Sequence, residues 1–252
     1  MLASGSSGNC TFVSTGRVKI LIDAGLSGLE TRRRLHSIGE SPESIQAIVI
    51  THEHWDHIGG LARLASLYKI PVYITAMTHA ALPPKTQLSA VETIQAGRGF
   101  QIGDLAIDPF TIPHDAADPV AFRLTSAGIR IAVCTDLGYI PQNVKDSLRG
   151  AHCMILEANH DIEMLRNGPY PWSVKQRVMS RTGHLSNLAL GEFLTSDFDR
   201  EARVLVLAHL SEQNNHPEIA RMAAATSLET TNASETRITV ASQREPTEVF
   251  EF

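Results

Sequence analysis

The sequence predicts an α/β protein in which helices cover two β-sheets. Strand-like segments stand at both ends of the chain, and segments whose apolar residues have helical spacing lie inside each half. Several strand-like runs of mainly apolar residues end in polar loops, as expected of buried strands. No repeat, low-complexity stretch or linker divides the 252 residues, so we expect a single domain over 1–252.

The composition is that of a globular protein with a sizeable core. Apolar residues make up 43% and charged residues 19% of the chain, and the net charge is −5. This charge argues against a protein that coats nucleic acid nonspecifically, but it is compatible with a local basic groove. The apolar runs are too short to span a bilayer, and no signal-peptide pattern opens the chain, so we expect a cytoplasmic protein and no membrane contact. No oligomeric state follows from these patterns.

In the first half, residues 10–14 and 18–22 are predicted to form a hairpin. Asp23 follows it and either braces nearby ligands or closes a turn; bracing is favoured. Ser27 and Glu30 have the spacing of a capping box for a helix reaching about residue 38. Strands are then expected at 45–50 and 71–75, a helix at 57–69, and a helical turn at 76–82 in which His79 is a surface residue.

The second half begins with short strands, which the turns between them separate. We expect strands at 99–102, 105–112, 119–126 and 129–135, a helix at 142–149, and a strand at 152–157. Helices follow at 161–167, 172–181 and 187–195, the last capped by Ser186 or Asn187. A strand at 204–208, a helix at 216–228, and strands at 236–241 and 249–252 complete the prediction.

Two further residue classes carry simple expectations. The three cysteines are far apart in apolar contexts, which predicts buried thiols rather than a disulfide framework. The cationic groups are expected to lie on solvated helix faces. The cysteines are Cys10, Cys134 and Cys153. The two cationic groups are Arg32–Arg34 and the set of Lys175, Arg177 and Arg181.

Four metal-binding side chains stand within six residues directly after the strand at 45–50. They are His52, His54, Asp56 and His57, followed by Gly59-Gly60. Imidazole nitrogens and carboxylate oxygens are the usual ligands of zinc and its first-row neighbours. In an extended turn, His52 and His54 can face one metal ion while Asp56 and His57 face a second.

Further candidate ligands stand at the ends of later strands. His114 follows the strand at 105–112, Asp136 follows 129–135, and His209 follows 204–208. Loops at strand ends often carry function. We therefore expect His114 to be a ligand, although a hydrogen-bonded loop histidine is the alternative, and Asp136 to be a carboxylate that bridges two metals.

The pattern His52-x-His54-x-Asp56-His57, His114, Asp136 and His209 resembles the metallo-β-lactamase superfamily from about Gly8 to Ala241. The resemblance implies a four-layer αββα sandwich with two divalent metal ions. Zn²⁺ is the favoured ion, and Mn²⁺ and Fe are the alternatives. It implies that His52, His54 and His114 bind one ion, that Asp56, His57 and His209 bind the other, and that Asp136 bridges them. β-Lactamases of this fold commonly have Cys at the fourth motif, so antibiotic hydrolysis is not expected.

Two motifs narrow the resemblance. Glu157 in Leu-Glu-Ala and His184 in Gly-His-Leu-Ser are similar to a paired motif of ribonuclease Z, in which the His assists at the scissile phosphate. Residues 4–9, 183–187 and 209–215 resemble the YycJ/WalJ branch, which is linked to exonuclease action on DNA. Only two strands separate His114 from Asp136, which leaves no room for the tRNA-gripping arm of ribonuclease Z. The interval from Asp136 to His209 is likewise too short for the large nucleic-acid-binding cap of the β-CASP nucleases.

These residues suggest a mechanism. Two divalent ions lower the pKa of a shared water, which Asp56 is expected to hold, and stabilise a displacement at phosphorus. His184, oriented by Glu157, is expected to protonate the leaving oxygen or to stabilise the developing charge; the alternative is a helix-start histidine without chemistry.

Three more residues are candidate substrate contacts. Asn214 and Asn215 either donate hydrogen bonds to a phosphate or cap the helix that begins near 216. Trp55 either stacks on a base or packs against the sheet edge, and packing is favoured.

The leading functional hypothesis is a two-metal phosphodiesterase, most specifically a DNA exonuclease-like nuclease. The first alternative is a hydrolase of a small ester, thioester or lactone, since the ligands alone do not choose the substrate. Others are a di-iron redox protein, because His and carboxylate sets also bind iron, and a non-catalytic partner protein, against which the intact ligand set argues.

Overall fold

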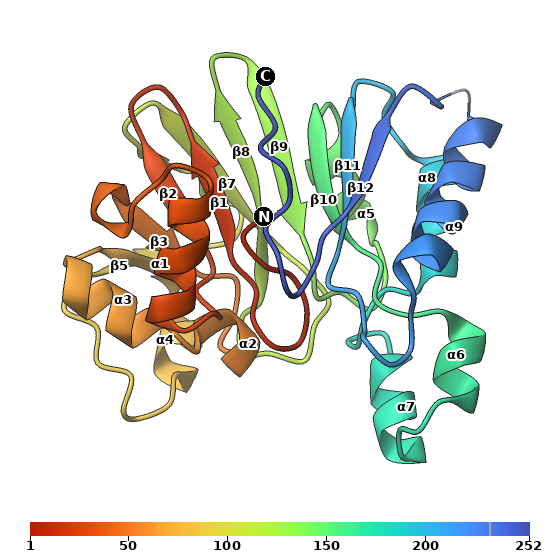
Figure 1. The fold of residues 1–252 in the computed structure, drawn as a ribbon, viewed down its shortest axis with the longest axis horizontal. Helices are drawn as coiled ribbons and strands as arrows, with labels where there is room; N and C mark the ends of the chain where they lie inside the picture. The colour runs from red at the N-terminus through yellow and green to blue at the C-terminus, as the bar shows by residue number, and fades with distance from the viewer. Residues whose placement is uncertain (232) are drawn as a thin grey trace.

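Two β-sheets pack face to face, with helices on their outer faces, in the computed structural model, which describes residues 1–231 and 233–252 (Figure 1). The strand order is β1-β2-β3-β4-β5 in one sheet and β12-β11-β10-β9-β8-β7-β6 in the other. The predicted αββα arrangement is therefore confirmed.

The first sheet is built by the N-terminal part of the chain. Strands β1 (Thr11–Ser14) and β2 (Lys19–Ile22) form the predicted antiparallel hairpin, and β3 (Ala47–Val49), β4 (Val72–Thr75) and β5 (Val91–Ile94) add in parallel. The other elements of this part are α1 (Gly28–Ser37), the 3₁₀ turn η1 (Pro42–Ser44), α2 (Trp55–Ile58), α3 (Leu61–Tyr68) and α4 (Ala76–Ala81). Strand β5 was not predicted, because its polar, largely exposed residues do not give a strand pattern.

The second sheet follows. Its strands are β6 (Phe100–Ile102), β7 (Leu105–Thr111), β8 (Val120–Ser126), β9 (Ile129–Cys134), β10 (Cys153–Glu157), β11 (Val204–Ala208) and β12 (Arg237–Val240). The helices between them are α5 (Gln142–Leu148), α6 (Ile162–Asn167), α7 (Trp172–Val178), α8 (Asn187–Ser196) and α9 (Pro217–Thr230). Ser186 caps α8 by accepting a hydrogen bond from Ala189 N, as one of the two predicted caps.

The strand directions bring distant segments to one edge. Strand β8 is antiparallel to both β7 and β9, and β9, β10 and β11 are mutually parallel, so the carboxyl ends of β7, β9, β10 and β11 lie at the same edge. The end of β3 joins this edge, because Val120 N at the start of β8 donates to Thr51 O over 3.0 Å. The candidate ligands that follow these strands are thereby gathered.

The core lies mainly between the sheets. Ile20, Val49, Phe122 and Val206 belong to one buried cluster that both sheets supply, and two further clusters lie under the helices. Burial of this apolar surface is the main favourable contribution to folding. Cys10, Cys134 and Cys153 are buried free thiols, as predicted.

Three element predictions need correction. The strand expected at 45–50 is shorter because η1 takes the preceding residues into a turn. The helix expected at 57–69 is interrupted at Gly60, where a Cβ would lie 1.9 Å from Leu26 O, so the backbones touch there. The strand expected at 249–252 is wrong. These residues are irregular, and Phe250 packs against the cluster between the sheets.

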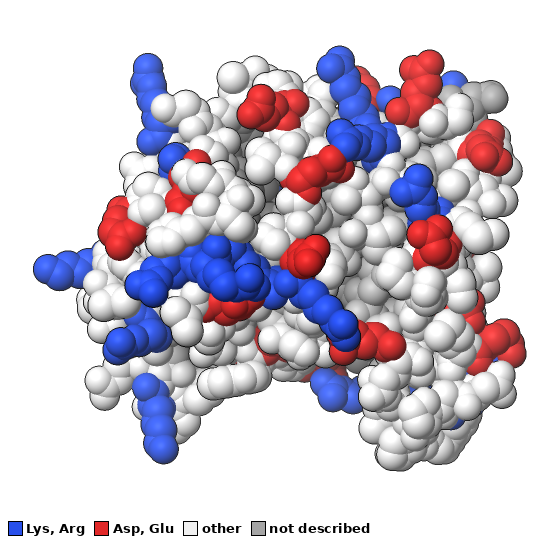
Figure 2. Space-filling model, viewed as in Figure 1, with Lys and Arg blue, Asp and Glu red and all other residues white. Residues whose placement is uncertain are grey.

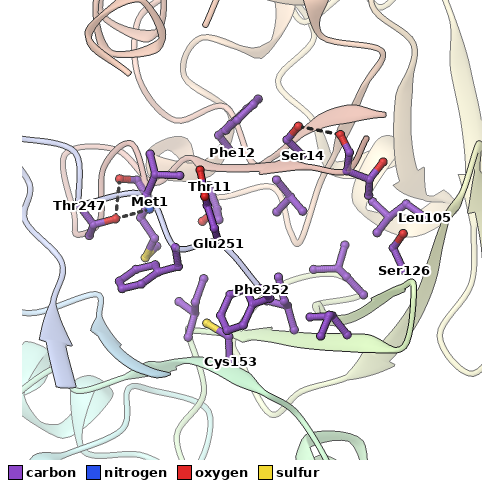
Figure 3. Close-up of a pocket in the computed structure, with 18 of the residues that line it drawn as sticks. Met1, Thr11, Phe12, Ser14, Leu105, Ser126, Cys153, Thr247, Glu251 and Phe252 are labelled. Atoms are coloured by element: carbon purple, nitrogen blue, oxygen red, sulfur yellow. Dashed lines mark hydrogen bonds between the residues drawn. The ribbon is translucent and has the colours of Figure 1, made fainter. Parts of the chain in front are cut away.

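A cavity of about 550 Å³ lies beneath this C-terminal segment, between β1 and strands β9 to β11 (Figure 3). Phe252 and Cys153 line it together with Thr11. None of the histidines or aspartates of the predicted metal site lines the cavity. It is therefore separate from the candidate centre.

The cationic side chains also depart from expectation. Figure 2 shows Lys and Arg gathered over the region of α1. Arg34 of α1 is nevertheless buried and donates to Leu2 O and to Gln243 O. Lys175 is buried as well and donates to Arg166 O. The prediction of solvated helix faces is wrong for both residues, because each side chain ties separate chain segments together.

Within residues 1–231 and 233–252, the helices are all too short or too polar to cross a membrane.

Candidate metal centre

The centre is built around the turn that follows β3. His54 is the extended residue before the single helical turn α2, which carries Asp56 and His57. Gly25 lies against this turn: a Cβ at Gly25 would be 1.7 Å from Asp56 O, and Asn9 N donates to the same oxygen over 2.7 Å. Close backbone packing, which only glycine allows here, therefore holds the turn.

The other candidate ligands come from strand ends with unusual backbone angles. Asp23 after β2, Asp136 after β9 and His209 after β11 have φ values of 61°, 62° and 55°. This left-handed region is sparsely populated by residues other than glycine and is found at functional sites. At all three positions the strand ends abruptly and the side chain belongs to the candidate centre or contacts it.

The structure brings all seven predicted ligands together. Donor atoms of His52, His54 and His114 lie within 4.8 Å of one another, and so do those of Asp56, His57 and His209. Asp136 joins the two sets, because its carboxylate lies within 4.8 Å of donor atoms of His52 in the first set and His57 in the second. The geometry thus has two ligand sets with a carboxylate between them.

In three of the candidate histidine ligands, the ring nitrogen that faces away from the centre contacts another part of the protein. Asp23 Oδ2 lies 2.7 Å from His57 Nδ1, and Thr51 Oγ1 lies 3.0 Å from His52 Nδ1. Gly183 O lies 3.2 Å from His114 Nδ1. Contacts of this kind fix the tautomer and orientation of a metal-binding imidazole, leaving Nε2 to face the centre. The predicted contact between Asp23 and the motif is confirmed.

The residues present fit divalent cations. Buried atoms His52 Nε2 and Asp136 Oδ2 have no hydrogen-bond partner among the residues described. Two imidazole nitrogens, His54 Nδ1 and His114 Nε2, face each other over 3.1 Å. Leaving buried polar atoms unpaired costs about 1–3 kcal/mol each, which coordination to a cation would remove.

The buried charges inside the centre shift one another's pKa values. Burial lowers the pKa values of His57 and His209, but the neighbouring carboxylates, Asp136 foremost, outweigh it and leave both pKa values raised well above the ordinary range. Burial raises the pKa of Asp136, but His209 and His57 outweigh that effect and leave it lowered. The buried carboxylates therefore favour positive charge at these imidazoles, as they would favour a metal cation.

Glu157 and His184 form a second layer beside the metal sets. Glu157 is fully buried; its Oε1 lies 2.7 Å from His184 Nδ1 and 3.1 Å from His209 Nδ1. Its Oε2 accepts hydrogen bonds from Leu137 N and Leu185 N. Burial raises the pKa of Glu157, but His184 and His209 hold it at about 2, so the group is a carboxylate. Burial lowers the pKa of His184, but Glu157 outweighs this and leaves it raised.

The side-chain amides of the two asparagines after His209 donate to other parts of the protein. Asn214 is fully buried and its amide donates to Ser211. The amide of Asn215 donates to Ala158 O and Asn187 Oδ1. The helix α9 is capped by His216, whose Nδ1 accepts from Glu218 N. The suggested cap is therefore wrong for both residues, because His216 provides it, and the suggested phosphate contact stays a prediction.

Trp55 is also placed differently from the favoured prediction. It is 70% exposed, so it does not pack against the sheet edge.

Some supporting residues were missed by the sequence interpretation. Asn9 Nδ2 lies 3.1 Å from Asp56 Oδ2, and Asn159 Nδ2 donates to His209 O over 2.9 Å. Ser4 Oγ accepts from His209 N over 2.7 Å. Ser4 and Asn9 are the first and last residues of the small, polar stretch 4–9. The composition of this stretch was a signal of a functional role, but only tertiary contacts show that it supports Asp56 and His209.

Comparison with known proteins defines the class. Residues 18–210 match the family model described as Beta-lactamase superfamily domain, and the chain belongs to this superfamily. It is thus a metal-dependent hydrolase, whose fold implies divalent metal ions.

Two curated relatives narrow the comparison. The chain is 38% identical to "Exodeoxyribonuclease YycJ" of Bacillus anthracis over 238 residues, which is 91% of this chain and 88% of that protein. It is also 38% identical to "Exodeoxyribonuclease WalJ" of Streptococcus pneumoniae over 227 residues, covering 88% of this chain and 84% of the relative. The predicted resemblance to the YycJ/WalJ branch is therefore confirmed.

A solved structure supports the fold. The metallo-β-lactamase fold protein YhfI from Bacillus subtilis aligns with a TM-score of 0.72 at 18% identity, covering 96% of this chain and 94% of that protein.

Proposed function

We propose that this protein is a two-metal nuclease that removes nucleotides from the end of a DNA strand. The observation that carries the proposal is His184, which Glu157 holds over 2.7 Å beside the two ligand sets. The names of the 38% identical relatives, both exodeoxyribonucleases, support DNA as the substrate.

In this proposal the seven ligands would hold two divalent ions, with Zn²⁺ expected. His52, His54 and His114 would hold one ion, Asp56, His57 and His209 would hold the other, and Asp136 would be shared between them. When bound, such ions supply Lewis acidity toward a phosphoryl oxygen and activate water.

The side chains perform the proton chemistry. Asp56, 20% exposed at its side chain, accepts a hydrogen bond from the attacking water. Glu157 keeps the proton on His184 Nδ1 and favours the imidazolium form. His184 Nε2 can then give its proton to the oxygen that leaves phosphorus, and a positioned acid of this kind contributes about 10²- to 10⁴-fold in rate.

The geometry of His184 favours this role over a merely structural one. Its side chain is 21% exposed, while Glu157 behind it is fully buried, so the carboxylate side is closed and the other side reaches solvent. The ring stacks on that of His209 with centroids 5.1 Å apart, which sets it beside a candidate ligand.

The test is digestion of end-labelled single- and double-stranded DNA and RNA with Zn²⁺ or Mn²⁺. We expect stepwise release of nucleotides from one end of DNA. Asp136→Asn protein, purified in parallel, controls for contaminating nucleases and should be inactive. The proposal is wrong if no nucleic acid is cut while a thioester or lactone is hydrolysed. Elemental analysis with a visible spectrum tests the di-iron alternative.

A further inference from the structure

Trp55 occupies an unusual position for a large aromatic residue. It is the first residue of α2 and stands between His54 and Asp56, which belong to the two different ligand sets. Its side chain is 70% exposed, although burying an aromatic side chain is normally favourable. No element of the proposed chemistry uses it.

The indole of Trp55 lies against the backbone of the same turn. Gly59 N donates to Trp55 O over 2.8 Å, and a Cβ at Gly59 would lie 3.3 Å from Trp55 Cε2. Glycine at 59 therefore lets the indole rest on the backbone. Trp55 lies three residues before buried Ile58, and residues at this spacing are neighbours on a helix, yet the indole itself stays exposed.

A cationic side chain lies at the loop of another ligand. Arg177 of α7 donates from Nε to Asp115 over 2.6 Å, and Asp115 directly follows His114. The Arg177 side chain is 63% exposed, and its two Nη atoms make no hydrogen bond within the described part of the chain. A guanidinium oriented in this way offers its remaining donors to a phosphate.

We propose that Trp55 is a stacking platform for one base of an unpaired nucleic-acid strand, and that Arg177 binds a phosphate of the same strand. This inference rests on the proposed nuclease function and names its substrate class as single strands or unpaired ends. An exposed indole can stack on any base, but bases inside a duplex are already stacked on each other. The side chains therefore favour a free strand of any sequence over a closed duplex.

Fluorescence tests the binding directly, because the chain has 2 tryptophans. Trp172→Phe leaves Trp55 as the single reporter, while Trp55→Phe leaves only Trp172, which is 63% exposed on α7. We expect a phosphorothioate oligo-dT strand to quench the first Zn²⁺-loaded variant and to leave the second unquenched. A blunt duplex of the same length should need a higher concentration for equal quenching.

Kinetics with single-stranded DNA gives the second readout. Stacking is worth about 1–3 kcal/mol per base, so Trp55→Ala should raise KM between about 5-fold and 150-fold, with a smaller effect on kcat. Trp55→Phe should retain most of the binding, and Trp172→Ala should match the wild type. Arg177→Gln should raise KM and reduce the slope of log affinity against log salt by about one.

The outcomes separate the two proposals. Quenching without cleavage of any nucleic acid overturns the nuclease and supports strand binding at Trp55. Cleavage without quenching, with KM unchanged in Trp55→Ala, overturns the role of Trp55. Absence of both overturns both.

Discussion

Replacing Glu157 by Gln tests the centre most sharply, because the change removes a charge and almost no volume. The carboxylate accepts from two backbone N–H groups through Oε2 and faces two imidazole Nδ1 atoms through Oε1, at 2.7 Å from His184 and 3.1 Å from His209. A Gln amide has only one acceptor oxygen. If that oxygen keeps the backbone bonds, the NH₂ group must point at both imidazoles.

The consequence is a change of tautomer. Nδ1 of His184 and His209 would have to accept a hydrogen bond, which moves the ring proton to Nε2. At His209 this atom faces Asp56 and Asp136, 3.3 and 3.4 Å away, and is its candidate metal donor. Loss of a supporting contact of this kind typically costs 10- to 100-fold in metal affinity or activity. Turnover of a phosphodiester should fall further, toward the 10²- to 10⁴-fold expected of a lost acid.

Metal affinity is measured by competition with a chromophoric chelator, and turnover is measured at saturating Zn²⁺. Glu163→Gln is the matched control, because Glu163 pairs with Arg166 on the exposed face of α6. It should leave both quantities unchanged. The reasoning is refuted if Glu157→Gln binds two ions with wild-type affinity and turns over at the wild-type rate.

Four further outcomes are expected. His184→Ala should lower phosphodiester turnover by about 10²- to 10⁴-fold while both metals stay bound; equal turnover would contradict its role. Gly60→Ala places a Cβ 1.9 Å from Leu26 O, so it should cost about 1–3 kcal/mol in free energy of unfolding and reduce metal content, whereas Gly16→Ala, which meets nothing within 4 Å, should do neither. Removing metal with EDTA should lower Tm by about 5–10 °C, since an ion at 100 times its Kd adds about 2.7 kcal/mol; an unchanged Tm would count against bound metal. Hydrogen bonds to two arginines lower the pKa of Glu30 to about 2 from 4.5. It therefore stabilises the fold above pH about 4.5, and this contribution is lost as pH falls toward 2. Between pH 7 and pH 3, the free energy of unfolding should therefore fall by about 0.2–1 kcal/mol less in Glu30→Gln than in the wild type. Urea unfolding at the two pH values measures this difference.

The sequence by itself determined the strands that carry the centre and the residue types at their ends. The motif at 52–57 is local, and His114, Asp136 and His209 each follow a run of strand-like residues, so periodicity and ligand chemistry were enough to select them. The same information predicted the contact of Glu157 with His184 through a family resemblance. Ligand identity is a property of residue type and position along the chain.

Only the tertiary structure decided which side chains support these residues and which remain free. Asn9 contacts Asp56 from a distant segment, and Asn215, which follows His209 closely, instead ties α8 to the end of β10. Trp55 is exposed although its neighbours along the chain face the centre. Such contacts depend on how sheets, loops and terminal segments pack, and no local pattern encodes them. The physical reason is that hydrogen-bond partners and exposure are set by residues far apart in sequence, whereas strand and ligand patterns are set by near neighbours.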